Sequence, residues 1–416
     1  MRLLILSPYL PHRNVGHGGG ISIRHMVRHL GRLHETTLVS LVRENERGLA
    51  AGLGAELGVD VRIIPFRDES ARGLSRLGLF ADRLGALGRS VVRNRPYYAA
   101  KYWSRRISAA VRDAVIAVEP DVIHVQCMQL TLYLRDLRRM RDAGVLEARL
   151  VLGSDELSSL PWRRRLEAAG NPVLRGMLRH QVRAWRRLQT DATRWADVTF
   201  CVTDQDRDML LADGGRACHT VPLGVDIEAV SPVHAPDGPP RLLFVGSFSH
   251  RPNRSAAEFL VDKVWPEAAK YGQDMEMVLA GRGSRRFLAA RGDVGASVTA
   301  LGFVEDLTDL YRRCHLFVAP MTEGGGIKIK ILEAMAHGIP VATTPTGAEG
   351  ITDEDDGAIW IAEPDEAFAD AVRLILDDPD AAAARAVKAR AVIEERFGWP
   401  AIARRMSDLY TDPERG

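Results

Sequence analysis

Short apolar runs alternate with longer amphipathic stretches through both halves of the chain. Such alternation is typical of sheets of parallel strands connected by helices. In the first half the pattern predicts strands at residues 3–7, 37–42, 61–65, 122–125, 150–152 and 198–202. In the second half it predicts strands at residues 241–245, 275–280, 298–301, 316–319 and 341–343. The sequence therefore predicts an α/β protein with a parallel sheet in each half.

The length of the chain and one composition shift predict two domains. A chain of 416 residues exceeds what one hydrophobic core usually holds. The stretch VPLGVDIEAVSPVHAPDGPPR is rich in Pro, Gly and Asp, as linkers are. We expect an N-terminal domain at residues 1–220, a linker or hinge at 221–240, a C-terminal domain at 241–398 and a final segment at 399–416.

Composition narrows the class of protein. The chain is 46% hydrophobic and 26% charged, with a net charge of +2, which argues against a bulk-basic nucleic-acid binder. Four scattered cysteines without C-x-x-C spacing signal neither a zinc site nor a disulfide framework. The N-terminus MRLLILSPYLP predicts a first strand and not a signal peptide. No apolar run approaches the ~18 residues that span a bilayer. We expect a soluble protein in a reducing cytoplasm.

The stretch EGGGIKIKILEAMAHGIPVATT, residues 323–344, holds the strongest candidate site. Its three glycines, Gly324, Gly325 and Gly326, run into a helix-period apolar pattern. Glycines allow close backbone approach, and a helix start offers free N–H groups, so the pattern predicts a phosphate or diphosphate site. Lys328 and Lys330 are placed in the first turn, where a cation is best understood beside an anion. The alternative is an ordinary turn with a solvated lysine pair.

The same stretch resembles the C-terminal signature of the family 4 retaining glycosyltransferases, which are sugar-nucleotide enzymes of the GT-B fold. In that family two glutamates, separated by seven residues, embrace a glycine-rich loop before an "LEAMA-G-PV" run. Glu333 matches the second glutamate, which the resemblance assigns to the nucleotide ribose. Eight positions earlier stands Gly325, whereas Glu323 lies ten positions back. Either Glu323 replaces the first glutamate from a longer loop, or that sugar contact has been lost.

The resemblance implies two Rossmann-like domains that face an interdomain cleft. The implied function is transfer of a sugar from a nucleoside-diphosphate sugar to a glycan, lipid-linked or small-molecule acceptor, in polysaccharide or glycoconjugate biosynthesis. Transfer is expected to retain the anomeric configuration by front-face displacement and to need no metal or other cofactor. The segment FGWPAIARRMSDLY resembles the family's final helix, which crosses back onto the N-terminal domain.

Two further segments are candidates for donor contacts. Gly18, Gly19 and Gly20 follow the first predicted strand and open a helix, although a ligand-free turn explains them as well. In the stretch FVGSFSHRPNRSAAEF the family usually carries an Arg and a Lys that bind the diphosphate, where Ser247 and Pro252 stand here. We expect nearby groups to replace that pair, Lys328 first. The predicted donor contacts are Arg251, Asn253, Arg254, Glu323, Ile327 and Lys330, together with the glycines.

Two strand ends complete the set of candidates. Phe303 and Val304 follow a predicted strand, where the family contacts the nucleobase, but Phe303 fits a core position equally well. His124 lies at the end of another strand, and the resemblance implies a catalytic histidine near this point. A lone histidine at a strand end is more often structural. With these alternatives open, the predicted catalytic residues are His124, Lys328 and Glu333.

Residues 72–112 form a basic stretch with leucines at helical spacing. Basic amphipathic helices bind anionic lipid, which predicts a peripheral contact with the inner face of the membrane. The alternative, which we favour, is that these helices cover the N-terminal sheet and extend their arginines into water.

Two other functions remain open. A sugar-nucleotide epimerase of the same fold would convert the donor with no acceptor present. A binding subunit without catalysis is suggested by the missing first glutamate and the missing diphosphate pair.

Overall fold

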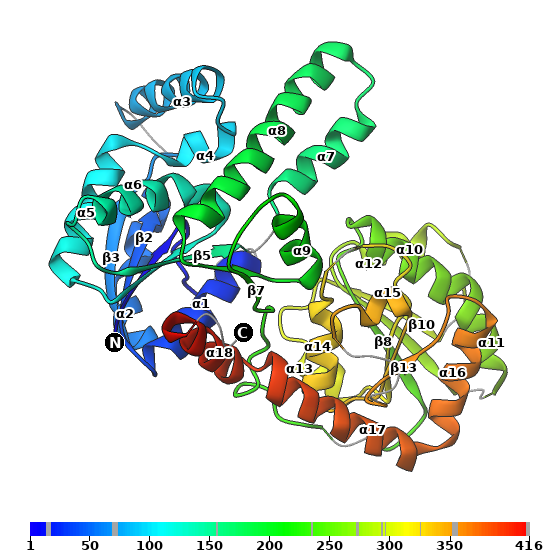
Figure 1. The fold of residues 1–416 in the computed structure, drawn as a ribbon. Helices are drawn as coiled ribbons and strands as arrows, with labels where there is room; N and C mark the ends of the chain where they lie inside the picture. The colour runs from blue at the N-terminus through cyan, green and yellow to red at the C-terminus, as the bar shows by residue number, and fades with distance from the viewer. Residues whose placement is uncertain are drawn as a thin grey trace. The chain divides into compact units, whose positions relative to one another are not determined.

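A computed structural model describes residues 1–13, 18–68, 74–154, 157–233, 236–271, 274–292, 294–295, 297–324, 326–351 and 357–412. The chain divides into two compact units (Figure 1). Unit 1 comprises residues 1–222 together with residues 402–416, and unit 2 comprises residues 223–401. Each unit holds one parallel sheet with helices around it (Figure 1), which confirms the predicted α/β class.

Unit 1 contains a seven-stranded sheet in the order β3-β2-β1-β4-β5-β6-β7. Its strands are β1 (Arg2–Ser7), β2 (Glu35–Val42), β3 (Asp60–Pro65), β4 (Val122–Gln126), β5 (Arg149–Ser154), β6 (Val198–Cys201) and β7 (Cys218–Thr220). Its helices are α1 (Gly18–Gly31), α2 (Leu53–Leu57), α3 (Leu74–Val92), α4 (Tyr97–Tyr102), α5 (Arg105–Val118), α6 (Thr131–Asp142), α7 (Ser159–Ala168), α8 (Pro172–Trp195) and α9 (Asp204–Ala212).

Unit 2 contains a six-stranded sheet in the order β10-β9-β8-β11-β12-β13. Its strands are β8 (Arg241–Val245), β9 (Glu276–Ala280), β10 (Val298–Gly302), β11 (Leu316–Ala319), β12 (Val341–Thr343) and β13 (Trp360–Ile361). Its helices are α10 (Arg251–Phe259), α11 (Trp265–Ala268), α12 (Ser284–Ala289), α13 (Thr308–Arg312), α14 (Ile329–Ala336), α15 (Pro345–Ala348), α16 (Glu366–Asp377) and α17 (Pro379–Val392); α18 (Trp399–Thr411) begins here and ends in unit 1.

The central strands form where the sequence has continuous apolar runs, because both faces of a parallel sheet are covered by helices. Leu3, Leu4, Ile5 and Leu6 of β1 have no exposed surface. Every predicted strand is present, with ends shifted by up to two residues. The short edge strands β7 and β13 were not predicted, because three and two residues are too few to show a period.

The order of the unit 2 strands places two loops together. After β8 the chain forms β9 and β10 on one side of β8, and it then forms β11 on the other side of β8. The strand order therefore reverses between β8 and β11. Leu242 and Leu243 of β8 pair with Leu316 and Phe317 of β11. Ligands of open parallel sheets bind outside the carboxyl ends of the strands at such a reversal point. The loops that follow Val245 and Ala319 lie at this position.

Gly281 allows two of these strand ends to approach closely. It follows β9 with a φ of +131°, and a Cβ placed there would lie 2.0 Å from the carbonyl oxygen of Gly246, the residue after β8. The Gly246 amide in turn donates to the Ala280 carbonyl at 2.9 Å. Only glycine fits both the backbone angle and the space.

The basic stretch 72–112 forms three helices with different surroundings. In α5 the apolar residues Ile107, Val111 and Val115 are buried against the sheet of unit 1, as the favoured interpretation requires. In α3 the large apolar residues Phe80, Leu84 and Leu87 are exposed instead. The favoured interpretation is therefore right for α5 and wrong for α3, because hydrophobic periodicity does not indicate which way an apolar face points.

We expect Gly281→Ala to lower the free energy of unfolding by roughly 2–4 kcal/mol, because it adds backbone strain and a clash with Gly246. Gly176→Ala is a matched control, because Gly176 lies in α8 and a Cβ there meets nothing within 4 Å. Removing a helical glycine should raise stability by roughly 0.5–1 kcal/mol. Urea unfolding of both variants measures the difference. A Gly281→Ala variant as stable as wild type would contradict this packing.

Candidate functional site

The glycine loop (residues 323–328) lies between β11 and α14 in unit 2 and directly precedes α14. Gly324 and Gly326 adopt φ angles of +103° and +79°, which favour glycine. Gly325 lies outside the described residues. Lys328 occupies the N-cap position of α14 in an extended conformation, and Ile327 packs against the core of the unit. The prediction that both lysines belong to the first turn is therefore wrong for Lys328, which precedes the helix.

Lys330 points into the unit from the first turn of α14. Its ammonium donates a hydrogen bond to Oδ1 of Asn253 and lies 4.7 Å from the centre of the Phe244 ring. Asn253 is held by its own bond to the Ser247 carbonyl at 3.0 Å. Burial, with a smaller effect of Lys328, lowers the pKa of Lys330 to about 7. The site therefore holds a cation whose charge is costly without a further anion.

Lys328 is the second buried cation. It is 8% exposed, and its ammonium donates to the carbonyl oxygen of Gly326 at 2.6 Å. Oε2 of Glu349 lies 3.6 Å from Nζ of Lys328, and about half of the Glu349 side chain is exposed. Burial lowers the pKa of Lys328 and the Glu349 charge partly offsets that effect. Two ammonium groups at the positive end of a helix make this a strong site for an anion.

Glu333 lies one turn further along α14, next to buried aromatic side chains. Burial raises the pKa of Glu333, and the nearby Tyr311 hydroxyl partly counteracts that rise. Burial and the charge of Glu333 both raise the pKa of Tyr311. The Tyr311 ring also stacks on His337 at 4.3 Å between centres. A carboxylate held in such a place is suited to accept hydrogen bonds from the hydroxyls of a ligand.

Glu323 is engaged at the other end of the glycine loop. Its Oε1 atom accepts a hydrogen bond from the Ser255 hydroxyl at 2.8 Å and lies 3.2 Å from Nε of Arg251. These contacts fasten the loop to the first turns of α10. Arg254, in the same helix, is exposed. The structure thus brings Arg251, Asn253 and Glu323 together with the lysines.

The loop after β10 presents an aromatic ring to solvent. Phe303 is 68% exposed, and the guanidinium of Arg282 lies 5.8 Å from its ring centre. Val304 is half-buried against the core of unit 2. Of the two interpretations of Phe303, the exposure opposes a core role and leaves the ring available for stacking.

The candidates in unit 1 have different environments. His124 has no exposed surface; its Nδ1 lies 2.6 Å from the Tyr410 hydroxyl and its Nε2 lies 2.8 Å from Oε1 of Gln126. Burial lowers the pKa of His124 to about 4. A ring with both nitrogens engaged in the interior supports the structural interpretation.

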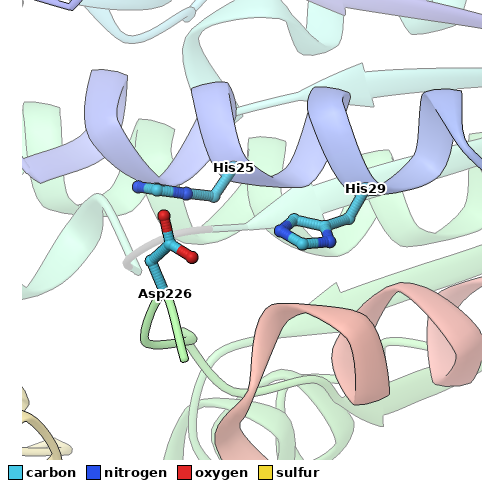
Figure 2. Close-up of side chains that lie close together, drawn as sticks. All are labelled: His25, His29 and Asp226. Atoms are coloured by element: carbon cyan, nitrogen blue, oxygen red, sulfur yellow. The ribbon is translucent and has the colours of Figure 1, made fainter. Parts of the chain in front are cut away.

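Gly18, Gly19 and Gly20 are the first residues of α1. Figure 2 shows His25 and His29, one turn apart, directed toward the same side of this helix. The third labelled residue of Figure 2, Asp226, belongs to unit 2. The histidine pair was not selected from the sequence, although its spacing of four residues is visible there.

Unit 2 also contains residues around the lysines and Glu333 that the sequence did not single out. Tyr311, Glu349 and Phe244 come from three separate segments, and each affects one of the three charged side chains. No spacing relates them to the glycine loop. Only the folded sheet brings them there.

Comparison with known proteins matches the part of the chain that holds these residues. Residues 239–378 match the profile of the family described as Glycosyl transferases group 1. Unit 2 carries a glycosyl transferases group 1 domain. The glycine loop, both lysines and Glu333 all fall inside the matched range.

Among curated proteins, the chain is 26% identical over 220 residues to the phosphatidyl-myo-inositol mannosyltransferase of Mycolicibacterium smegmatis, covering 51% of this chain and 56% of that protein. It is 30% identical over 185 residues to the lipopolysaccharide core biosynthesis mannosyltransferase LpsB of Rhizobium meliloti, covering 41% and 52%. The chain thus spans about half the length of these relatives.

Among solved structures, the sucrose-phosphate synthase of Thermosynechococcus elongatus matches with a TM-score of 0.66 at 17% identity, covering 99% of this chain and 98% of that one. Anabaena HepE in complex with UDP matches with a TM-score of 0.65 at 15% identity, covering 99% and 100%. The likeness spans both units, and it confirms the predicted GT-B fold class.

The pKa of Lys330 predicts a pH-dependent stability for the group 1 domain. Its folded-state pKa of about 7 is below that of an exposed lysine, so its charge destabilises the fold below pH 7. This cost fades as pH rises from about 7 to about 10. Lys330→Met removes this cost at every pH. The free energy of unfolding of the variant minus that of wild type should therefore fall by roughly 1–3 kcal/mol from pH 6.5 to pH 9.5.

Urea unfolding across that range measures the effect. Lys388→Met is the control for the loss of a lysine at an exposed position of the same unit. Parallel pH profiles for wild type and Lys330→Met would show that Lys330 is not desolvated as described.

Proposed function

We propose that this chain is a glycosyltransferase that moves a hexose-type sugar from a nucleoside-diphosphate sugar to an acceptor hydroxyl. The observation that carries the proposal is the buried lysine pair at the start of α14, inside a group 1 domain. Two desolvated ammonium groups beside a glycine loop are poorly satisfied by the protein alone and well satisfied by a diphosphate.

In this proposal the diphosphate lies against Lys328, Lys330 and the first N–H groups of α14. Lys330 is the better placed replacement for the missing family pair, because Asn253 connects it to the loop after β8. Lys328 is already shared between the Gly326 carbonyl and Glu349. The positive charge these side chains supply is the basis for proposing that transfer needs no metal.

The other donor contacts follow from exposure and position. Glu333 accepts hydrogen bonds from the ribose, and the exposed ring of Phe303 stacks on the nucleobase, with Val304 supporting it. Glu323 is held by Ser255 and Arg251, so its role is to fix the glycine loop in a shape that admits the sugar. His124 has no exposed surface, and we assign it no role in the reaction.

For the reaction we propose retention by front-face displacement, as the resemblance to the family 4 enzymes implies. The bond between the anomeric carbon and the diphosphate oxygen breaks, and a bond forms between that carbon and the acceptor hydroxyl oxygen on the same face. The departing diphosphate oxygen is stabilised by the lysines and the helix start. The same oxygen takes the proton of the attacking hydroxyl. Stabilising a leaving group with fixed charges requires no nucleophile from the protein.

The relatives bear on the acceptor. Their names place one on phosphatidyl-myo-inositol and one in lipopolysaccharide core synthesis, which supports a lipid-linked or glycan acceptor here. The structure neighbour HepE is described with UDP, which supports a nucleotide-sugar donor. No helix in the described part of the chain is long and apolar enough to cross a membrane. We propose a cytoplasmic enzyme of glycoconjugate synthesis.

A binding subunit without catalysis is the second candidate, because both contacts of Glu323 are within the protein. It predicts binding of a sugar nucleotide without turnover. An epimerase predicts conversion of the donor in the absence of an acceptor. Incubating each candidate donor with and without acceptors distinguishes the three functions.

We expect Glu333→Gln to weaken nucleotide binding by roughly 1.5–3 kcal/mol, because it removes a charge-assisted hydrogen bond to the ribose. A thermal-shift screen of UDP, GDP and dTDP first identifies the nucleotide, and titration calorimetry then measures its affinity. Glu395→Gln is the control, since Glu395 is exposed on the same unit. Unchanged affinity in a folded Glu333→Gln variant would remove Glu333 from the proposed site.

We expect the product to keep the anomeric configuration of the donor sugar. NMR of the anomeric proton after transfer from an α-configured sugar nucleotide should show an α-linked product. A β-linked product would indicate direct backside attack, and the front-face mechanism would then be wrong.

A further inference from the structure

The helix α3 in unit 1 directs its largest apolar side chains into solvent. Phe80, Leu84, Leu87 and Val91 recur every three or four residues and are therefore on one face of the helix. Their exposed fractions are 65%, 55%, 53% and 67%. Isolated exposed apolar residues are common, but a continuous stripe along three turns marks an interaction surface.

The opposite face of α3 lies over a basic cavity. The cavity has a volume of about 660 Å³ and lies between α3 and the segment that runs from α4 into α5. Seven Arg and Lys side chains line it, against one carboxylate, Asp82, among the described residues. Gly78 faces this side, because a Cβ there would meet the guanidinium of Arg67 at 2.9 Å. The helix thus has an apolar outer face and a cationic inner surface.

Arg89 is one of these cations, and one of its N–H groups has no acceptor in the described structure. Its Nη2 atom donates to the carbonyls of Ala100 and Trp103, at 3.1 and 3.2 Å, and its guanidinium lies over the Trp103 ring. Its Nε atom is buried without an acceptor in the described structure. Burial lowers the pKa of Arg89. A buried N–H group that faces no acceptor favours an anionic ligand.

The neighbouring helix α8 also carries exposed apolar side chains. The Ser90 hydroxyl in the last turn of α3 accepts a hydrogen bond from Nε2 of Gln181 at 3.4 Å. One turn before Gln181 stands Met177, which is 64% exposed, and Val173 is 73% exposed. In the view of Figure 1, α3 and the far end of the α7–α8 hairpin both lie in the upper part of unit 1.

The two units have opposite net charges. Unit 1 holds 38 Lys and Arg against 26 Asp and Glu, a net charge of +12, whereas unit 2 holds 18 against 28, a net charge of −10. The net charge of the whole chain is only +2, because the charges of the two units nearly cancel. A basic unit with an exposed apolar helix matches the charge of an anionic lipid surface.

We propose that unit 1 binds anionic phospholipid bilayers through α3. The stripe Phe80, Leu84, Leu87 and Val91 enters the boundary between headgroups and acyl chains, and the cavity receives a lipid phosphate. A second copy of the chain is a poorer occupant, because two units of charge +12 repel each other. The surface lies in unit 1, and the proposed donor site lies in unit 2. Loss of lipid binding and loss of donor binding are therefore separate results.

Flotation of the full chain with vesicles tests the proposal. The protein should float with vesicles of phosphatidylcholine and phosphatidylglycerol, and much less with phosphatidylcholine alone, and 0.5 M NaCl should weaken binding. Leu84→Gln combined with Leu87→Gln should reduce binding roughly tenfold. Leu374→Gln with Val387→Gln is the matched control, because both residues are exposed in the acidic unit 2. That control should bind like wild type.

A second pair of variants tests the cavity. Arg93→Ala with Arg105→Ala, both lining it, should weaken binding roughly fivefold per arginine. Arg286→Ala with Arg396→Ala, both exposed in unit 2, should leave it unchanged. A thermal unfolding midpoint equal to that of wild type, measured without ligand, shows that each variant is folded.

Three outcomes would overturn the proposal. In the first, the wild type does not float with anionic vesicles. In the second, the variant with Leu84→Gln and Leu87→Gln binds vesicles as well as wild type. In the third, the wild type forms dimers in the absence of vesicles and this variant does not. The third outcome would assign the stripe to a second copy of the chain.

Discussion

The candidate site depends on two lysine side chains that the fold removes from water. Lys330 is held by Asn253 above the Phe244 ring, and Lys328 by the Gly326 carbonyl and Glu349. An ammonium group in such surroundings loses hydration that these partners only partly replace. Folding therefore loses hydration free energy at these two ammonium groups, and a bound anion offsets that loss by its electrostatic attraction to them. The glycine conformations and the placement of α10 keep this arrangement in one geometry.

The parallel sheet explains why these residues meet. Asn253 and Lys330 are 77 positions apart, and they belong to the segments that follow β8 and β11, the two strands between which the strand order reverses. In unit 1 the corresponding neighbours are β1 and β4. There His124 is covered by Tyr410 of α18 and by Gln126. Gly153 of β5 allows this packing, because a Cβ at that position would lie 2.5 Å from Nε2 of His124.

The sequence predicted the fold well because continuous apolar runs are the direct signature of strands buried on both faces. It also located the glycine loop, whose residues are adjacent in the chain. It could not predict that His124 is enclosed, because Tyr410 is 286 positions away. Nor could the sequence show that the apolar face of α5 is buried and that of α3 is exposed. Both segments have apolar residues at helical spacing, and only the tertiary structure shows that one apolar face packs on the sheet and the other faces solvent.

The opposite charges of the two units imply that the two proposed anion sites attract their ligands by different means. In unit 1 the arginines near α3 add to a net charge of +12, so attraction extends over a surface and is reduced by salt. In unit 2 the net charge is −10, and the average field repels a nucleoside diphosphate. Binding there must rest on short-range contacts with Lys328, Lys330 and the start of α14. Charges in such buried contacts are screened much less by dissolved ions. A site of this kind selects its ligand by geometry, because an anion gains little until it comes within contact distance of the two lysines and the first N–H groups of α14.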